Sequence, residues 1–428
     1  MKKANLVLMA ALAAAGLAGV AGGSLLPVAA AVAKDKEAPK QKLSPDVAKP
    51  LVAAQTAIQA KNWDEALTHI DEAGAVSSKT PYDTYMTDEL GWYVYLQKKD
   101  YVKSAETLER VMASGFVADA DKSQRLRALA QMELQNKQYP KALQYGEQYM
   151  ALHPEDAEIA LALAQAHYLS NDIPGAKAAA EKLVASGPKP AEAALLLALR
   201  TSYELKDEAG TTRALEGLVR NYPQPKYWED LLNNQLFRTK DERGLRALYR
   251  LMADTNTLDK GEEFAEMGGT LVTAGFPTEA KQVLERGMSA NLLQGDAKAR
   301  AQADLDRART GATADAKEIT TAATQLAAAK NGMQMVGIGK LYFSNGDYEK
   351  SVDALQKGLA KGGITDADDV NMLLGIANSR LGKTNEARTA FDAVKNPTLV
   401  EVARLWKLKL DVASAPAGAA PAATPTTG

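Results

Sequence analysis

The sequence contains no cysteine among its 428 residues. This absence excludes disulfide bonds, thiolate nucleophiles and cysteine metal ligands, so stability must come from packing alone. Only three histidines are present, His69, His153 and His167, and none has a second ligand at metal-site spacing. The H-E-x-x-H, G-x-S-x-G and phosphate-loop patterns are also missing. We therefore predict no catalytic residues, no metal site, no cofactor and no enzymatic activity.

The chain also lacks an excess of charge of either sign. It has 51 Lys and Arg against 53 Asp and Glu, and the two signs are interspersed along the chain. A nucleic-acid-binding surface needs clustered basic residues, so nucleic acid is not a predicted partner. No stretch alternates β-branched and polar residues as a half-buried strand would. The composition therefore predicts an all-α protein.

Small side chains recur along the chain at a nearly constant spacing of 33 to 38 residues. A period in this range is typical of stacked helix pairs, in which small residues allow two antiparallel helices to approach closely. The ten positions are Ala66, Ser104, Ala142, Ala176, Thr211, Gly244, Ala280, Ala316, Ser351 and Ala387.

The clearest copy covers residues 335–359. Gly339 lies on the predicted first helix, and Ser351 and Leu355 lie on the second. Asn345-Gly346 between them is a turn signal, because Asn and Gly tolerate the left-handed conformation that ends a helix. Gly339 and Ser351 are twelve residues apart across this turn, and we expect them to meet at the seam of the pair.

This pattern resembles the tetratricopeptide repeat over residues 49–411. The resemblance implies a right-handed superhelical solenoid of about ten helix-turn-helix repeats. The weakest copy lies near 297–329, where Asp304 and Thr320 occupy sites that should be small or apolar. We expect this copy to be either a less stable pair or the seam between two stacked blocks.

The N-terminus has the features of a secretory signal. Met1-Lys2-Lys3 precedes an uncharged run that ends at Ala31-Val32-Ala33. A positive start, an apolar segment and an A-x-A exit predict a cleaved signal peptide over residues 1–33 and a periplasmic location. An uncleaved membrane anchor is the alternative, although Gly22-Gly23-Ser24 and Pro27 interrupt the apolar run. After cleavage we expect no stable membrane insertion.

The remaining segments are expected to flank the solenoid. Residues 34–48 read as a charged, proline-containing linker, and the Ala/Pro/Thr-rich residues 412–428 as a disordered tail. A helix over 398–410 is predicted to cap the stack, because an open-ended solenoid needs a closing element. Its apolar face consists of Leu399, Val402, Trp406 and Leu410.

The first helix of each pair is expected to line the concave side of the solenoid, where such proteins bind peptide or protein. The helical phase places a polar set with a few aromatic residues on this side. The predicted protein-binding residues are Tyr93, Gln97, Arg127, Gln131, Gln135, Gln165, Arg200, Glu204, Asn233, Phe237, Lys340 and Arg380.

Several segments within about residues 200–395 resemble a narrower group, the periplasmic tetratricopeptide proteins associated with TonB–ExbB–ExbD energy transduction. The segments are Leu218–Pro223 with Lys226–Trp228, Ala274–Ala280 with Leu284–Gly287, and Gln356–Gly363 with Leu373–Ala377. The resemblance implies an accessory of TonB-type envelope energy transduction, with components of that system as partners.

Two other functions stay open from the sequence. A scaffold for cell-wall or outer-membrane assembly would have the same export signal and the same repeats. An unrecognised enzyme is a remote alternative, because no segment outside the repeats is long enough to hold a catalytic domain.

Overall fold

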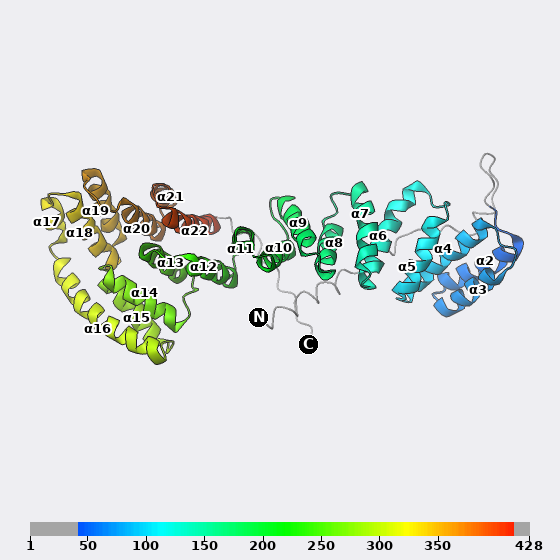
Figure 1. Cartoon of the computed structure of the whole chain (residues 1–428), viewed down its shortest axis with the longest axis horizontal. Coiled ribbons are helices and arrows are strands. Elements are labelled where there is room, and N and C mark those ends of the chain that lie inside the picture. Colours follow the sequence, from blue (N-terminus) through cyan, green and yellow to red (C-terminus); the bar gives the residue numbers. More distant parts are fainter. Residues whose placement is uncertain (1–41, 415–428) are drawn as a thin grey trace. The chain divides into compact units, whose positions relative to one another are not determined.

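The computed structural model describes residues 42–414, and this part of the chain is all-α (Figure 1). No β-strand occurs within residues 42–414. The chain divides into two compact units, of which the first ends at Thr211 and the second begins at Thr212. Within each unit, consecutive helices pack against one another as antiparallel pairs. The predicted all-α stack of helix pairs is thereby confirmed.

The N-terminal unit consists of four helix pairs, then α10, and ends within α11. Its helices are α2 (Pro45–Gln59), α3 (Trp63–Ala75), α4 (Pro81–Gln97), α5 (Tyr101–Ala113), α6 (Asp119–Gln135), α7 (Tyr139–Leu152), α8 (Ala157–Leu169), α9 (Ile173–Ala185), α10 (Glu192–Glu204) and the first residues of α11 (Glu208–Asn221).

The C-terminal unit contains the rest of α11 and eleven further helices within the described residues. They are α12 (Pro225–Arg238), α13 (Glu242–Asp254), α14 (Gly261–Thr273), α15 (Pro277–Ser289), α16 (Gly295–Glu318), α17 (Ala322–Ala328), α18 (Gly332–Ser344), α19 (Tyr348–Lys361), α20 (Ala367–Arg380), α21 (Thr384–Asp392) and α22 (Pro397–Ser414).

The seams between paired helices lie where the small residues predicted them. The Ser104 hydroxyl donates a hydrogen bond to the Trp92 carbonyl oxygen at 2.8 Å, and the Ser351 hydroxyl donates to that of Gly339 at 2.9 Å. Both bonds join residues twelve positions apart across a turn. Ala142 and Ala387 are fully buried at the equivalent seams. The predicted helix phase is therefore confirmed in both units.

The turns inside the pairs use a left-handed residue, but its type differs between the units. In the N-terminal unit, lysines 61, 99 and 137 have φ of 59°, 60° and 59°. Gly275, Gly346 and Gly382 take this role in the C-terminal unit, with φ between 71° and 81°. Glycine adopts this conformation at little cost, whereas a lysine there is strained.

One position of the ladder was predicted wrongly. Ala316 is exposed, because α16 runs as one continuous helix of 24 residues instead of turning back as a pair. The segment is rich in alanine and has no Asn-Gly or proline turn, so nothing stops the helix. Asp304 is tolerated because Arg307 binds it and Gly269 leaves room for its carboxylate. The two units divide at Thr211, so the weak copy is not the seam between them.

The predicted terminal segments fall largely outside the described residues. These are the signal peptide over 1–33, the linker up to residue 41 and the tail from residue 415. The described residues include the end of the expected linker and the start of the expected tail. Helix α2 begins at Pro45, within the expected linker, and α22 continues to Ser414, within the expected tail. Ser44 fixes this early start, because its backbone N–H and hydroxyl donate to the Asp83 carboxylate at 2.9 and 2.8 Å.

Helix α13 departs from the regular stack of the C-terminal unit. It contacts α12, α14 and α22, and every residue from Arg246 to Met252 is buried. A Cβ on Gly244 would lie 2.9 Å from Thr239, the C-cap of α12, and 3.6 Å from Thr398 at the start of α22, so this glycine packs against both. In Figure 1, α13 lies inside the curve made by α14, α18, α20 and α22. A helix buried on all sides is a core element.

Arg250 anchors α13 at the centre of this unit. Its guanidinium is within 4.5 Å of the Phe276 ring centre and 4.7 Å of that of Phe343, and it donates to both carboxylate oxygens of Glu279 at 2.7 and 3.0 Å. The Arg250 side chain is only 3% exposed. A buried charge of this kind is tolerated only when it is paired and fully hydrogen-bonded.

The seam of α18 yields a test with two glycines of one helix. A Cβ on Gly339 would lie 2.6 Å from the Leu355 side chain, whereas a Cβ on Gly337 would meet nothing within 4 Å. Gly339→Ala should therefore lower the free energy of unfolding by about 1–3 kcal/mol through overpacking. Gly337→Ala should raise it by about 0.5–1 kcal/mol through helix propensity. Urea denaturation of both variants measures the difference, and equal effects would show that the seam is misplaced.

The anchoring role of Arg250 yields a second test. Arg250→Met should lower the free energy of unfolding by about 3–5 kcal/mol, because Glu279 would be left buried without its main partner. Adding Glu279→Met should recover much of this loss. Lys357→Met is the control, since the exposed Lys357–Asp353 pair contributes about 0–1 kcal/mol. Denaturant unfolding of the full chain would contradict the described α13 packing if Arg250→Met behaved like Lys357→Met.

Candidate functional site

Eight of the twelve predicted binding residues lie on consecutive first helices of the N-terminal unit. We call this surface of α4, α6, α8 and α10 the first-helix face. Contacts join α6 to α8 and α8 to α10, so their side chains form one continuous surface. The eight residues are Tyr93 and Gln97 on α4, Arg127, Gln131 and Gln135 on α6, Gln165 on α8, and Arg200 and Glu204 on α10.

Charged and aromatic side chains link α8 to α10 on the first-helix face. The Tyr168 hydroxyl donates to the Glu204 carboxylate at 2.6 Å. The Arg200 guanidinium lies 4.5 Å from the centre of the Tyr168 ring and 3.3 Å from Glu204. Burial and the Glu204 carboxylate raise the pKa of Tyr168, so its hydroxyl remains a donor. The arrangement places an aromatic ring and a paired charge at the surface.

A second link joins α6 to α8. Arg127 donates to Asp156 at 3.2 Å and to Glu158 at 3.1 Å. Gln131, one turn further along α6, is 8% exposed, and its side-chain oxygen has no hydrogen-bond partner among the described residues. Gln165 is equally buried at the neighbouring position of α8. Two carboxamides thus lie at corresponding positions of adjacent repeats.

The first helices of the C-terminal unit are placed differently, because the chain's own α13 covers them. The Lys340 ammonium lies 2.9 Å from Asp369, which also binds Arg246 of α13. The Arg380 guanidinium lies 3.1 Å from Asp254 at the end of α13. Lys340 and Arg380 are therefore engaged with α13 and its ion pairs, whereas the sequence analysis placed them on an open concave surface.

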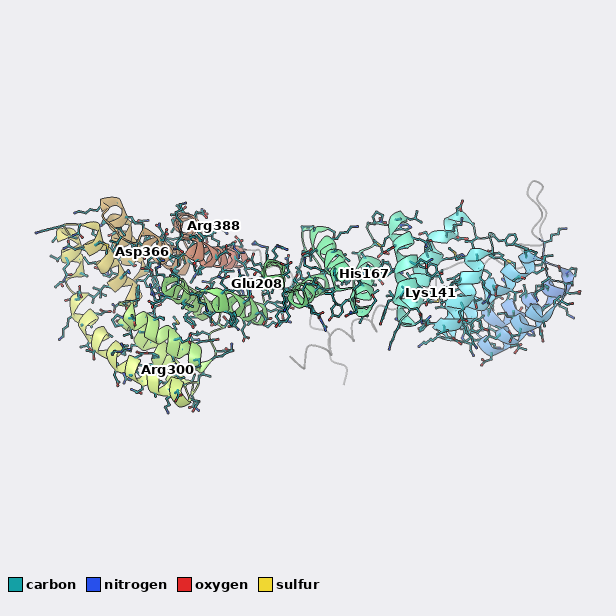
Figure 2. All side chains as sticks on the ribbon, viewed as in Figure 1. Lys141, His167, Glu208, Arg300, Asp366 and Arg388 are labelled. Atoms are coloured by element: carbon teal, nitrogen blue, oxygen red, sulfur yellow. The ribbon has the colours of Figure 1, made fainter. Side chains whose placement is uncertain are left out.

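The Asp369 carboxylate, which faces α13, is held in its charged form. Burial alone would raise the pKa of Asp369, but Lys340 and Arg246 outweigh it and lower the pKa below its usual range. Burial lowers the pKa of Arg246 despite the nearby Asp369. A further pair joins Arg243 to Asp366 at 2.9 Å, the latter labelled in Figure 2. This network fixes α13 against α20.

The last two predicted residues lie on α12. Phe237 is 85% exposed, with the Lys240 ammonium 6.0 Å from its ring centre. Asn233 is partly buried one turn earlier. The structure brings neither of them into the α13 network. An exposed aromatic of this size is an accessible contact for a partner, but a single one does not make a patch.

The α13 network was not predicted from the sequence. The repeat pattern assigned no role to Arg246, Arg250 or Phe343. One signal was present in the sequence. Arg243, Arg246 and Arg250 follow one another at intervals of three and four on one side of α13, and such a stripe of cations indicates that carboxylate partners lie elsewhere in the unit.

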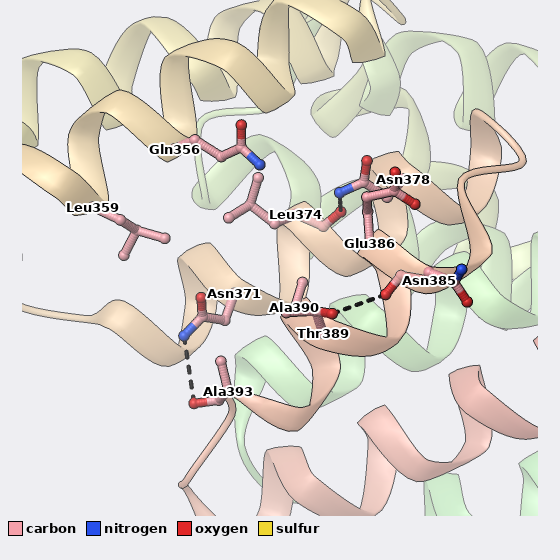
Figure 3. Close-up of a pocket in the computed structure, with 10 residues that line it drawn as sticks. All are labelled: Gln356, Leu359, Asn371, Leu374, Asn378, Asn385, Glu386, Thr389, Ala390 and Ala393. Atoms are coloured by element: carbon pink, nitrogen blue, oxygen red, sulfur yellow. Dashed lines mark hydrogen bonds between the residues drawn. The ribbon is translucent and has the colours of Figure 1, made fainter.

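A separate pocket of about 580 Å³ opens in the C-terminal unit between α19, α20 and α21 (Figure 3). We call it the amide pocket, because side-chain amides supply much of its polar surface. On α20 it uses the side opposite α13. The lining residues are Gln356, Leu359, Asn371, Leu374, Asn378, Asn385, Glu386, Thr389, Ala390 and Ala393.

A smaller hollow of about 250 Å³ is lined mainly by charged residues of α11, α21 and α22. Its cations are already neutralised within the unit. Asp411 binds both Arg220, at 2.7 Å, and Arg388, which is labelled in Figure 2. Arg404 binds Glu216, and Lys407 binds Asp392. These internal ion pairs leave the hollow with no strong charge of one sign.

The histidines have local partners. His69 contacts Glu72, His153 contacts Ser123, and His167 contacts Asp172, each on its own part of the stack. Within residues 42–414, no three His, Asp or Glu side chains come together as a metal site. Across the same residues, no helix has the length and apolar content that a membrane span would need.

Comparison with known proteins identifies the repeats. Residues 133–199 and 336–398 each match a family model of the tetratricopeptide repeat. No curated protein matches the chain significantly. The matches lie in different units, one including α8 of the first-helix face and the other running from within α18 to the start of α22.

Three solved structures give low overall similarity. The Naa15/Naa10 complex bound to HypK-THB has 15% identity and a TM-score of 0.40, over 85% of this chain and 60% of that one. A tetratricopeptide repeat protein from Parabacteroides merdae has 12% identity and a TM-score of 0.31, over 78% and 99%. The APC/C hetero-tetramer Cut9–Hcn1 has 11% identity and a TM-score of 0.23, over 85% and 80%.

The chain spans about 60% of the length of the first of these structures. The repeat matches and the observed helix pairs agree on the type of fold. Stacks of this type serve as surfaces for binding other proteins. The chain thus contains tetratricopeptide repeats in both of its units.

Proposed function

We propose that this protein is an exported scaffold that binds a partner protein on the first-helix face of its N-terminal unit. The observation that carries the proposal is the contrast between the two units. In the C-terminal unit α13 covers the first helices, whereas α6 and α8 pack mainly on their neighbours in the stack. The first-helix face therefore offers a continuous surface for a partner.

The chemistry of the first-helix face suits a polypeptide ligand. Tyr93 and Tyr168 provide rings that are partly exposed, and Gln97 and Gln135 provide carboxamides that are partly or fully exposed. Carboxamides can both donate to and accept from backbone amides, and tyrosine combines apolar contact with a polar tip. The fold is typical of scaffolds without catalytic activity, and the residues of this face offer no nucleophile beside a general base.

We further propose that the partner belongs to a TonB–ExbB–ExbD type system of the bacterial envelope. Support comes from the local resemblance over about residues 200–395 and from the predicted signal peptide. The segments that carry this resemblance belong to the C-terminal unit from Leu218 onward. An assembly scaffold for the cell wall or outer membrane is the competing outcome of the experiments below.

Export is tested by sequencing the N-terminus of the protein isolated from its native bacterium. Release with the periplasmic fraction and a first residue within a few positions of Lys34 are expected, because a signal peptidase cleaves after the A-x-A exit. A β-lactamase fusion after Ser44 serves as the control for translocation. An intact Met1 in the membrane or cytoplasmic fraction would overturn the cleaved-signal proposal.

Partner binding is tested by pull-down from detergent-treated envelope extracts with tagged full-length protein. TonB, ExbB or ExbD components should be recovered. Gln135→Arg with Glu204→Arg should reduce this recovery at least about tenfold, because misplaced charge at an interface costs several kcal/mol. The matched control is Glu147→Arg with Gln148→Arg, two exposed positions on α7.

The outcomes separate the two parts of the proposal. Equal recovery by the face variant and the α7 control would overturn the first-helix face as the binding surface. Recovery of cell-wall or outer-membrane assembly proteins in place of TonB components, still sensitive to the face variant, would retain the scaffold and overturn the TonB assignment.

A further inference from the structure

The amide pocket exists because one helix of the stack is short. Helix α19 has 14 residues and α21 has 9, so the two helices that flank this side of α20 differ in length. A difference of five residues is about 7.5 Å of helix. The chain leaves α21 at Asp392 and turns through Ala393 to α22. The uncovered side of α20 forms the floor of the pocket.

This side of α20 is distinct from the side that holds α13. Asp369 and Arg380 point to the α13 network, whereas Asn371, Leu374 and Asn378 line the pocket. The three pocket residues follow one another at intervals of three and four, which places them on one helical stripe. Whatever binds here therefore need not displace α13.

Asn378 is the least satisfied polar side chain of the pocket. It is 2% exposed, and its amide nitrogen donates to the Leu374 carbonyl oxygen at 2.9 Å. Its side-chain oxygen has no hydrogen-bond partner among the described residues. A buried acceptor without a donor lowers stability, so its retention needs an explanation. A ligand with an N–H group would supply the missing donor.

The other lining groups restrict the chemistry of that ligand. Glu386 is the only charged residue in the lining, and Leu359, Leu374 and Ala390 add apolar surface. The Thr389 hydroxyl already donates to the Asn385 carbonyl oxygen at 3.0 Å, so it can only accept another bond. The pocket therefore favours a ligand that donates hydrogen bonds, carries positive charge and has small apolar groups.

We propose that the amide pocket binds an extended segment of a partner polypeptide, with a main-chain N–H donating to Asn378 and a basic side chain near Glu386. Carboxamides match the donor and acceptor of a peptide group. A helical ligand would not use them, since its own backbone groups are already paired. This site is independent of the proposed first-helix face.

The spacing of the carboxamides agrees with an extended ligand. Asn371 and Asn378 are seven residues apart on α20, which is about 10.5 Å along the helix axis. A polyproline II segment repeats every three residues, or about 9.3 Å, and leaves its backbone groups unpaired. The two carboxamides can therefore contact equivalent peptide groups one turn of such a segment apart.

The experiment uses the full-length protein and three synthetic probes, with affinities measured by isothermal titration calorimetry or ligand-observed NMR. The first probe is acetyl-Ala-Ala-Lys-Ala-Ala-amide, and the second has Glu in place of Lys. The third replaces the central backbone amide of the first with an ester, which removes one N–H donor. Lysine methylamide serves as a ligand control for simple cation binding.

The lysine peptide should bind about threefold or more tightly than the glutamate peptide, as expected for one exposed ion pair. Glu386→Lys, at an exposed position, should reverse this order. The ester probe should bind about fivefold more weakly than the amide probe, the ratio for one hydrogen bond. Asn378→Ala should remove the difference between amide and ester.

The matched control is Asn345→Ala at the C-cap of α18, because Asn345 makes the same bond to a carbonyl oxygen four residues back, at 2.9 Å, outside the pocket. It should leave all affinities unchanged. Circular dichroism melting checks that the variants fold. If Asn378→Ala does not fold, the reversed peptide preference of Glu386→Lys tests the site in its place. The first-helix variants Gln135→Arg and Glu204→Arg should leave peptide binding intact, which separates this site from the proposed function.

Three results would overturn the proposal. The first is no preference between the lysine and glutamate peptides, or no binding of either. The second is an ester effect that persists in Asn378→Ala. The third is lysine methylamide binding as tightly as the peptide, which would make the pocket a site for cations only.

Discussion

The close approach of two helices at a small side chain is the constraint on which both units depend. Where Ser351 meets Gly339, the hydroxyl reaches the backbone of the partner helix directly. A larger side chain would push the helices apart, and because each pair packs on the next, the displacement would pass to its neighbours. The recurring small residue thus sets the distance at which every bulkier residue must pack.

The two units use this common architecture for different purposes. In the N-terminal unit the first helices keep a polar, partly exposed surface, and their charges are paired between neighbouring repeats. In the C-terminal unit the same helices surround α13, with Arg250 between two phenylalanine rings and ion pairs at both ends of the helix. In that unit the proposed binding site, the amide pocket, lies on the side of α20 opposite α13, beside the short helix α21.

The local rules of the fold could be predicted from the sequence, because they depend on residues close together in the chain. The seam at Ser351, the turn at Gly346 and the buried face with Leu399 and Trp406 follow from spacing and residue type. Ala316 shows the limit. It has the right size and spacing, but no turn signal precedes it, and the helix continues through the expected break.

The α13 network could not be predicted in the same way, because its pairs are brought together only by the curvature of the stack. Nothing in the spacing of Arg246 and Asp369, 123 residues apart, indicates that they meet. The amide pocket depends likewise on a difference in helix length between α19 and α21. Of the twelve predicted binding residues, those of α4 to α10 share one face, whereas Lys340 and Arg380 turned out to contact the α13 network.

The position of α13 within the chain has a consequence for how the protein acquires its structure. Helix pairs of the N-terminal unit close over contacts a few tens of residues apart, so each can form as soon as it is synthesised. Helix α13 can complete its packing only after Trp406 has been synthesised, 159 residues after Ala247. The indole N–H of Trp406 donates to the Ala247 carbonyl oxygen. Until the last helix arrives, its apolar surface stays unprotected, and during that interval the nascent chain is most exposed to aggregation and most dependent on chaperones.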